Sequence, residues 1–124
     1  MKMKKKVIVI DDKYEIRNLL NMFLSKDYEV VTFENGHTAF TWLQSGNIPD
    51  GIISDIQMPE LDGRKFLSLV KSSGMFNKIP IIMLSSIHNS DERIKMLDMG
   101  ADDYVVKPFN PAELKVRLSR LIKN

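Results

Sequence analysis

Short apolar runs alternate along the chain with longer segments in which apolar residues recur every three to four positions. A run that is apolar at every position is typical of a parallel strand covered on both faces. A run rich in β-branched and aromatic residues also indicates a strand, even where it is not apolar at every position. These runs predict five strands, at residues 7–10, 28–33, 51–54, 80–84 and 104–106.

The intervening segments have the period of a helix. They predict helices at residues 14–25, 37–44, 64–72 and 90–99, and a last one from residue 111 onward. The first helix has its apolar residues at i, i+3, i+4 and i+7, namely Ile16, Leu19, Leu20 and Phe23. Asn89 to Glu92 resembles a capping box, and Asn110-Pro111 supplies an N-cap followed by proline at the first helical position.

Five strand–helix units in succession predict an α/β fold. Strands that alternate with helices form a parallel sheet, which right-handed crossovers cover on both faces. The chain has 124 residues, enough for a single hydrophobic core without disulfide or metal support. Because no linker, repeat or low-complexity stretch interrupts the pattern, we expect one doubly wound domain spanning residues 1–124.

Composition narrows the class of protein further. Apolar residues make up 44% and charged residues 27%, close to the globular average, which argues against disorder and coiled coil. The absence of cysteine excludes disulfides, thiolate zinc sites and thiol catalysis.

The net charge of +2 depends on the four lysines within residues 1–6. Without these lysines, 14 basic side chains stand against 16 acidic ones, and the remainder has a net charge of −2. We therefore interpret residues 1–6 as a solvated basic tail and expect no nucleic acid binding by this domain.

Neither targeting nor membrane insertion is predicted. The apolar run after the lysines stops at Asp11, well short of the roughly 7–15 residues of a signal-peptide core. No stretch approaches the ~18–20 apolar residues of a membrane span. We expect a soluble, cytoplasmic domain without membrane contact.

Polar residues that could take part in binding or catalysis follow four of the predicted strands. In a doubly wound sheet, functional groups gather at the carboxyl ends of the strands. These positions hold Asp11 and Asp12, then Asp55, then Ser85 and Ser86, and finally Lys107-Pro108. Singly, each residue could be an ordinary cap or turn residue, but jointly they indicate a site.

Three carboxylates at one sheet edge repel one another unless a proton or a cation intervenes. Oxygen ligands favour Mg²⁺ or Ca²⁺, and an incomplete, wet ligand set favours Mg²⁺. A lysine and a hydroxyl across from the metal would complete a cradle for a phosphoryl group. One of the carboxylates could then act as a covalent nucleophile.

The chain resembles a response-regulator receiver domain of two-component signalling. The resemblance rests on four stretches across the whole chain: Val7 to Asp12, Ile53 to Pro59 with Asp62-Gly63, Pro80 to Ser86, and Gly100 to Phe109. It implies a flavodoxin-like (βα)5 fold with strand order 2-1-3-4-5. It also implies a signalling module whose chemistry is limited to self-catalysed phosphotransfer and autodephosphorylation, rather than an enzyme.

The same resemblance implies the roles of the acidic residues. Asp55 corresponds to the phosphoacceptor, which receives a phosphoryl group from the phosphohistidine of a histidine kinase or a phosphotransfer protein. Asp12 corresponds to the direct Mg²⁺ ligand and Asp11 to one acting mostly through water. Asp55 and the backbone carbonyl of Gln57 complete the implied ligand set.

Three further roles follow from the resemblance. Lys107 would pair with the phosphoryl group, next to a cis bond to Pro108. Ser85 and Tyr104 would form a switch in which Ser85 moves inward and Tyr104 fills the space. This switch would change the surface of the fourth helix, fifth strand and fifth helix, which controls a partner or output domain. The mixed charges of that surface are compatible with a homodimer interface and with an ordinary charged surface.

Other classes of protein fit less well. A phosphohydrolase with an aspartate nucleophile would have an acid two residues after Asp55, where this chain has Gln57. A flavodoxin-like electron carrier would have a phosphate-binding loop in place of Asp11 to Tyr14. A receiver-like module that only binds partners would lack an acidic or lysine position, and none is missing. The kinase, the signal, the output, the lifetime of the phosphorylated state and the oligomeric state are not predicted.

Overall fold

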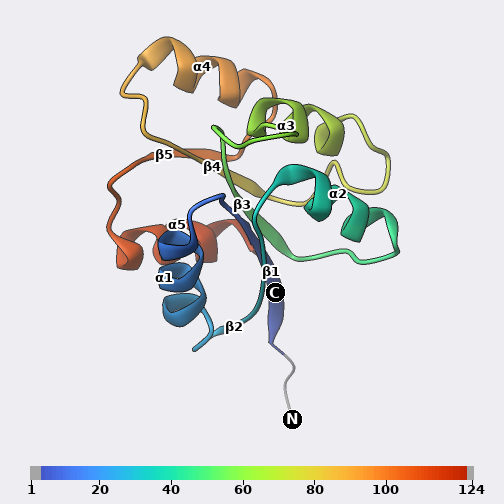
Figure 1. The fold of residues 1–124 in the computed structure, drawn as a ribbon, viewed down its shortest axis with the longest axis vertical. Helices are drawn as coiled ribbons and strands as arrows, with labels where there is room; N and C mark the ends of the chain where they lie inside the picture. Colours follow the sequence, from blue (N-terminus) through green and yellow to red (C-terminus); the bar gives the residue numbers. More distant parts are fainter. Residues whose placement is uncertain (1–3, 123–124) are drawn as a thin grey trace.

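The computed structural model describes residues 4–122, which form five strands and five helices in strict alternation (Figure 1). In chain order the elements are β1 (Lys5–Ile10), α1 (Tyr14–Leu24), β2 (Tyr28–Phe33), α2 (Gly36–Gln44), β3 (Gly51–Asp55), α3 (Gly63–Lys71), β4 (Ile81–Ser85), α4 (Ser90–Asp98), β5 (Asp103–Val106) and α5 (Pro111–Leu121). The predicted α/β class is confirmed, with boundaries within two residues of those expected.

The five strands form one parallel sheet in the order β2-β1-β3-β4-β5. This is the strand order that the resemblance implied, and it is confirmed. The chain first builds outward from β1 to β2 and then crosses back to β3 on the other side of β1. The switch point therefore lies between β1 and β3, where ligands of such sheets bind at the carboxyl ends.

Helices cover both faces of the sheet. Figure 1 shows α1 and α5 on one side and α2, α3 and α4 on the other. Side chains alternate along each strand, so β1 contributes to two cores. Its residues Ile8 and Ile10 pack in a cluster with residues of α2, α3 and α4, whereas Val7 and Val9 pack with residues of α1 and α5. Burial on both faces explains why the strands read as continuous apolar runs.

The N-terminal strand begins earlier than the pattern predicted. Lys5 and Lys6 pair with β2 opposite Tyr28 and Glu29, so two residues of the expected basic tail belong to the sheet. The Lys6 amide also donates to the Asp50 carboxylate at 2.7 Å. Hydropathy misses these positions because backbone pairing, not apolar burial, extends the strand. The lysine at position 2 lies outside the described residues.

Two local predictions are corrected. In α1 the buried residues are Leu20 and Leu24, whereas Leu19 is 41% exposed, because the helix packs on a face turned away from Leu19. At the start of α4, Asn89 caps the helix by accepting from the Asp91 amide at 2.8 Å. Glu92 does not complete a capping box, since its carboxylate instead accepts from Arg64 of α3. A tertiary partner thus replaces the local one.

The capping prediction for the last helix is confirmed. The Asn110 side chain accepts hydrogen bonds from the amides of Ala112 and Glu113, and Pro111 occupies the first turn. Between residues 4 and 122 there is no helix of sufficient length and hydropathy to cross a bilayer.

The start of α3 lies directly against the end of β3. The Gly63 amide donates to the Ile56 carbonyl at 2.7 Å. A Cβ atom at Gly63 would lie 2.3 Å from the carbonyl oxygen of Asp55 and 2.6 Å from the Cα of Ile56. Only glycine allows this approach, which fixes the backbone that carries Asp55.

We expect Gly63→Ala to destabilise the domain by about 2 kcal/mol or more, because backbone atoms of β3 would have to move away from the added methyl group. Urea unfolding measures the change. Gly74→Ala is the control: a Cβ there meets nothing within 4 Å, so its effect should stay within about 0.5 kcal/mol. Equal effects of the two substitutions would contradict this account.

Candidate functional site

The carboxyl ends of β1, β3, β4 and β5 place polar residues at one edge of the sheet. Asp55 and Ser85 are the last residues of β3 and β4, and Asp11 and Lys107 directly follow β1 and β5. Asp11 and Ser85 are fully buried and Asp55 is 4% exposed. The apolar strands beneath carry these side chains into a region of low solvent access.

Three carboxylates converge there. Asp11, Asp12 and Asp55 each present one oxygen, and these oxygens lie within 4.8 Å of one another. Asp11 and Asp55 are buried, whereas Asp12 is exposed. This set of oxygen ligands, closed on the protein side and open on the solvent side, suits a divalent cation that keeps part of its water.

The Lys107 ammonium group lies beside two of these carboxylates. Its Nζ lies 2.9 Å from Oδ2 of Asp11 and 3.4 Å from Oδ1 of Asp55. Burial alone would lower the pKa of Lys107, but the hydrogen bonds and charges of Asp11 and Asp55 raise it above its usual value. Lys107 therefore stays charged and links the β1 and β3 carboxylates. The Lys107–Pro108 bond is cis, as the resemblance implied.

The surroundings of Asp55 raise the pKa of its carboxyl group. Burial and then the negative charge of Asp11 raise its pKa to about 6, against the opposing effect of Lys107. Asp12 contributes in the same direction with a smaller effect. One ammonium group thus does not balance the carboxylates, and a further positive charge at this edge would lower the pKa of Asp55.

A backbone amide and an arginine side chain hold Asp11 in place. Its Oδ1 accepts from the Lys13 amide at 2.9 Å, and its carbonyl accepts from Nη1 of Arg17 at 2.8 Å. Sequence reasoning did not single out Arg17, whose place one turn into α1 was the available signal. Asp12 does not cap α1, since the N-cap is Lys13 and no side chain caps this helix among the described residues. The simple capping explanation for Asp12 is therefore wrong.

The β4–α4 segment brings Ser85 and Tyr104 to a common neighbour. Oγ of Ser85 accepts from the Ile87 amide at 3.0 Å, and the Tyr104 hydroxyl donates to the Ile87 carbonyl at 3.1 Å. Tyr104 is 6% exposed, so its ring lies inside the domain. Gln57 is exposed, and its side-chain oxygen accepts from Oγ of Ser86 at 3.3 Å.

Most of this chain matches the sequence model of one protein family. The model of the family described as "Response regulator receiver domain" matches residues 7–119. The match includes every residue of the site.

Individual proteins similar to this chain are also regulators. The chain is 42% identical over 121 residues to the probable transcriptional regulator ycf27 of Cyanophora paradoxa, covering 97% of this chain and 49% of that protein. The chemotaxis response regulator CheY4 of Vibrio cholerae superposes with a TM-score of 0.88 at 33% identity, covering 97% of this chain and 99% of the other. The Mn²⁺-bound form of response regulator Rcp1 superposes with a TM-score of 0.80 at 25% identity, covering 91% and 88%. The chain spans about half the length of the curated ycf27 relatives it matches.

Binding of a divalent cation should depend on pH, because a proton on Asp55 competes with the ion. With the pKa of Asp55 at about 6, we expect affinity for Mg²⁺ to fall about tenfold between pH 7 and pH 5. Isothermal titration calorimetry measures this. In Asp55→Asn the same pH change should have less than about a threefold effect, and an equal dependence in both proteins would contradict the assignment.

The raised pKa also implies that ionised Asp55 destabilises the metal-free fold. The cost is absent below the unfolded pKa near 3.8, grows as the pH rises toward 6 and is complete above it. Asp55→Asn should therefore raise the free energy of unfolding at pH 7 by about 1 to 3 kcal/mol, and by almost nothing at pH 3.5. Urea unfolding without metal at both pH values tests this, and destabilisation at pH 7 would refute it.

Proposed function

Since this chain belongs to the response regulator receiver domain family, a family of signalling modules rather than classical enzymes, we propose that Asp55 is its phosphoacceptor. Receiver domains interact with histidine kinases. The proposed donor is the phosphohistidine of such a kinase or of a phosphotransfer protein, and the proposed cofactor is Mg²⁺.

The observation that carries this proposal is the position of Asp55 at the switch point, where its carboxylate lies 3.4 Å from the Lys107 ammonium and within 4.8 Å of an oxygen of Asp11 and of Asp12. An oxygen of ionised Asp55 attacks phosphorus, a P–O bond forms, and the P–N bond breaks as the imidazole leaves with the electron pair. The reaction needs Asp55 without its proton, a state that prevails above about pH 6 even before a metal binds.

The residues present fit a magnesium ion. Asp12 and Asp55 would hold it directly, Asp11 through water, and the backbone carbonyl of Gln57 would be a further ligand. The ion supplies positive charge that offsets the oxygens of the transferred group. Only oxygen ligands are involved, and the exposure of Asp12 leaves room for water.

Lys107 and Ser85 would contact the phosphoryl group. Nζ of Lys107 already lies 3.4 Å from Oδ1 of Asp55, so the ammonium could turn to an oxygen of a phosphoryl group attached to Asp55. Oγ of Ser85 accepts from the Ile87 amide and keeps its own hydrogen to donate. Tyr104 would report the change, since its hydroxyl binds the carbonyl of that same Ile87.

The output surface of α4, β5 and α5 stays a prediction, as do its partner and a homodimer through it. In this structure Arg117 of α5 pairs within the chain, at 3.1 Å from both Asp103 and Glu113. A dimer that used these charges would exchange internal pairs for external ones, so its net stabilisation would be small. The expected cytoplasmic location likewise stays a prediction.

The decisive test is the intact mass after incubation with acetyl phosphate and Mg²⁺. We expect one added phosphoryl group, lost in Asp55→Asn and lost when EDTA removes the metal. Asp50→Asn is a matched control, because Asp50 precedes the first residue of β3, at the end opposite Asp55, and its carboxylate accepts a hydrogen bond from the Lys6 amide. An adduct that persists in Asp55→Asn would refute the proposed acceptor. Absence of both this adduct and a beryllofluoride complex would refute the function.

A further inference from the structure

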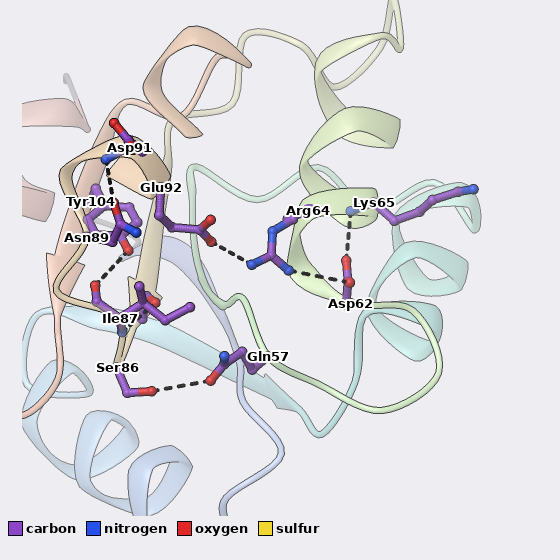
Figure 2. A network of polar contacts seen from close by, with 11 residues as sticks. Gln57, Asp62, Arg64, Lys65, Ser86, Ile87, Asn89, Asp91, Glu92 and Tyr104 are labelled. Atoms are coloured by element: carbon purple, nitrogen blue, oxygen red, sulfur yellow. Dashed lines mark hydrogen bonds and ion pairs between the residues drawn. The ribbon is translucent and has the colours of Figure 1, made fainter. Parts of the chain in front are cut away.

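An ion pair joins α3 and α4, the helices that follow β3 and β4 (Figure 2). The loop from β3 to α3 contains Gln57, and the loop from β4 to α4 contains Ser86. Nη2 of Arg64 in α3 lies 2.8 Å from Oε1 of Glu92 in α4. The hydrogen bond between Ser86 and Gln57 forms a second link, nearer the site. We call the Arg64–Glu92 pair the clasp.

The clasp is better protected than an ordinary surface pair. The Glu92 side chain is only 13% exposed and that of Arg64 is 34% exposed. The other guanidinium nitrogen, Nη1, lies 3.7 Å from Asp62, the N-cap residue of α3, which orients the group. Glu92 also lies in the first turn of α4, where the helix dipole favours a negative charge. Limited exposure reduces screening by salt, so the pair retains coupling that a fully exposed pair loses.

The clasp contacts the first turn of α4, which lies close along the chain to Ile87. The chain runs from Ile87 through Asn89, the N-cap of α4, to Glu92 within the first turn. Ile87 accepts the hydroxyl hydrogen of Tyr104 and donates its amide to Ser85. Figure 2 shows both links, from Glu92 across to α3 and from Tyr104 to Ile87. A shift of α4 away from α3 would therefore displace Ile87, to which both Ser85 and Tyr104 form hydrogen bonds.

We propose that Arg64 and Glu92 are positioning residues, which hold α4 against α3 in the arrangement with Tyr104 buried and thereby raise the affinity of the site for a phosphoryl group. This inference rests on the proposed function. An ion pair that exists in one arrangement only shifts the population toward it, and ligand affinity scales with the population that can bind. Neither residue forms an ion pair or hydrogen bond with the site carboxylates Asp11, Asp12 and Asp55, so we expect affinity for the metal alone to stay unchanged.

The test compares Arg64→Gln with Lys65→Gln and Glu92→Ala with Asp91→Ala. Alanine replaces Glu92 because a glutamine oxygen would still accept from Arg64. The controls remove the same charge one residue away, and within residues 4–122 neither Lys65 nor Asp91 forms a side-chain ion pair. We expect the two clasp variants to bind beryllofluoride, a phosphoryl mimic, about three- to tenfold more weakly in Mg²⁺. Their affinity for Mg²⁺ alone, and both affinities of the controls, should stay within about twofold.

Two further measurements separate positioning from simple loss of stability. The double variant Arg64→Gln/Glu92→Ala should bind beryllofluoride no more weakly than the worse single variant, since both remove one interaction. The ring signals of ¹³C-labelled tyrosine, of which the chain has three, should show the Tyr104 resonance moving toward an exposed environment in the clasp variants, even without metal. Thermal unfolding shows whether each variant is folded.

Unchanged beryllofluoride affinity and an unchanged Tyr104 resonance in folded clasp variants would overturn the inference, whatever their melting temperatures. Additive effects in the double variant would also overturn it. If the wild-type domain forms no beryllofluoride complex, the proposed function fails first. The Tyr104 resonance of the metal-free variants then still decides whether the clasp holds α4.

Discussion

Electrostatic repulsion among Asp11, Asp12 and Asp55 is the constraint around which the site is organised. Folding removes two of these carboxylates from water and places an oxygen of each within 4.8 Å of the others, an arrangement unfavourable unless positive charge is supplied. Lys107 supplies one charge and leaves Asp55 with a pKa of about 6. The remaining imbalance makes the same cluster receptive to a divalent cation and, in the function proposed, to chemistry at Asp55.

The rest of the fold keeps these groups from moving apart. β1 and β3 are buried on both faces, so neither strand can shift without opening one of the two cores. At Gly63 the first turn of α3 contacts the backbone of Asp55 too closely for any side chain. The free energy that holds the carboxylates together therefore comes from apolar packing and backbone contact far larger in extent than the site itself.

In the switch proposed for this domain, a few polar contacts would couple the site to the outer surface. Ser85 and Tyr104 meet at Ile87, and the clasp between Arg64 and Glu92 fixes the helix that follows. These contacts are weaker than the cores on either side, so they are where an arrangement can change without unfolding. A domain that signals needs such a soft element beside a rigid sheet.

The pattern of apolar and polar residues was enough to predict the sheet, the alternation of strands and helices, and the residues Asp11, Asp55, Ser85 and Lys107 at the strand ends. It could do so because burial on both faces imposes a continuous apolar pattern, and parallel strands bring their carboxyl ends to one edge. Three features became visible only in the folded domain: Glu92 binds Arg64 instead of capping its own helix, Leu19 lies outward, and Arg17 supports Asp11. Each of these depends on which distant surface an element meets, and local periodicity carries no information about that.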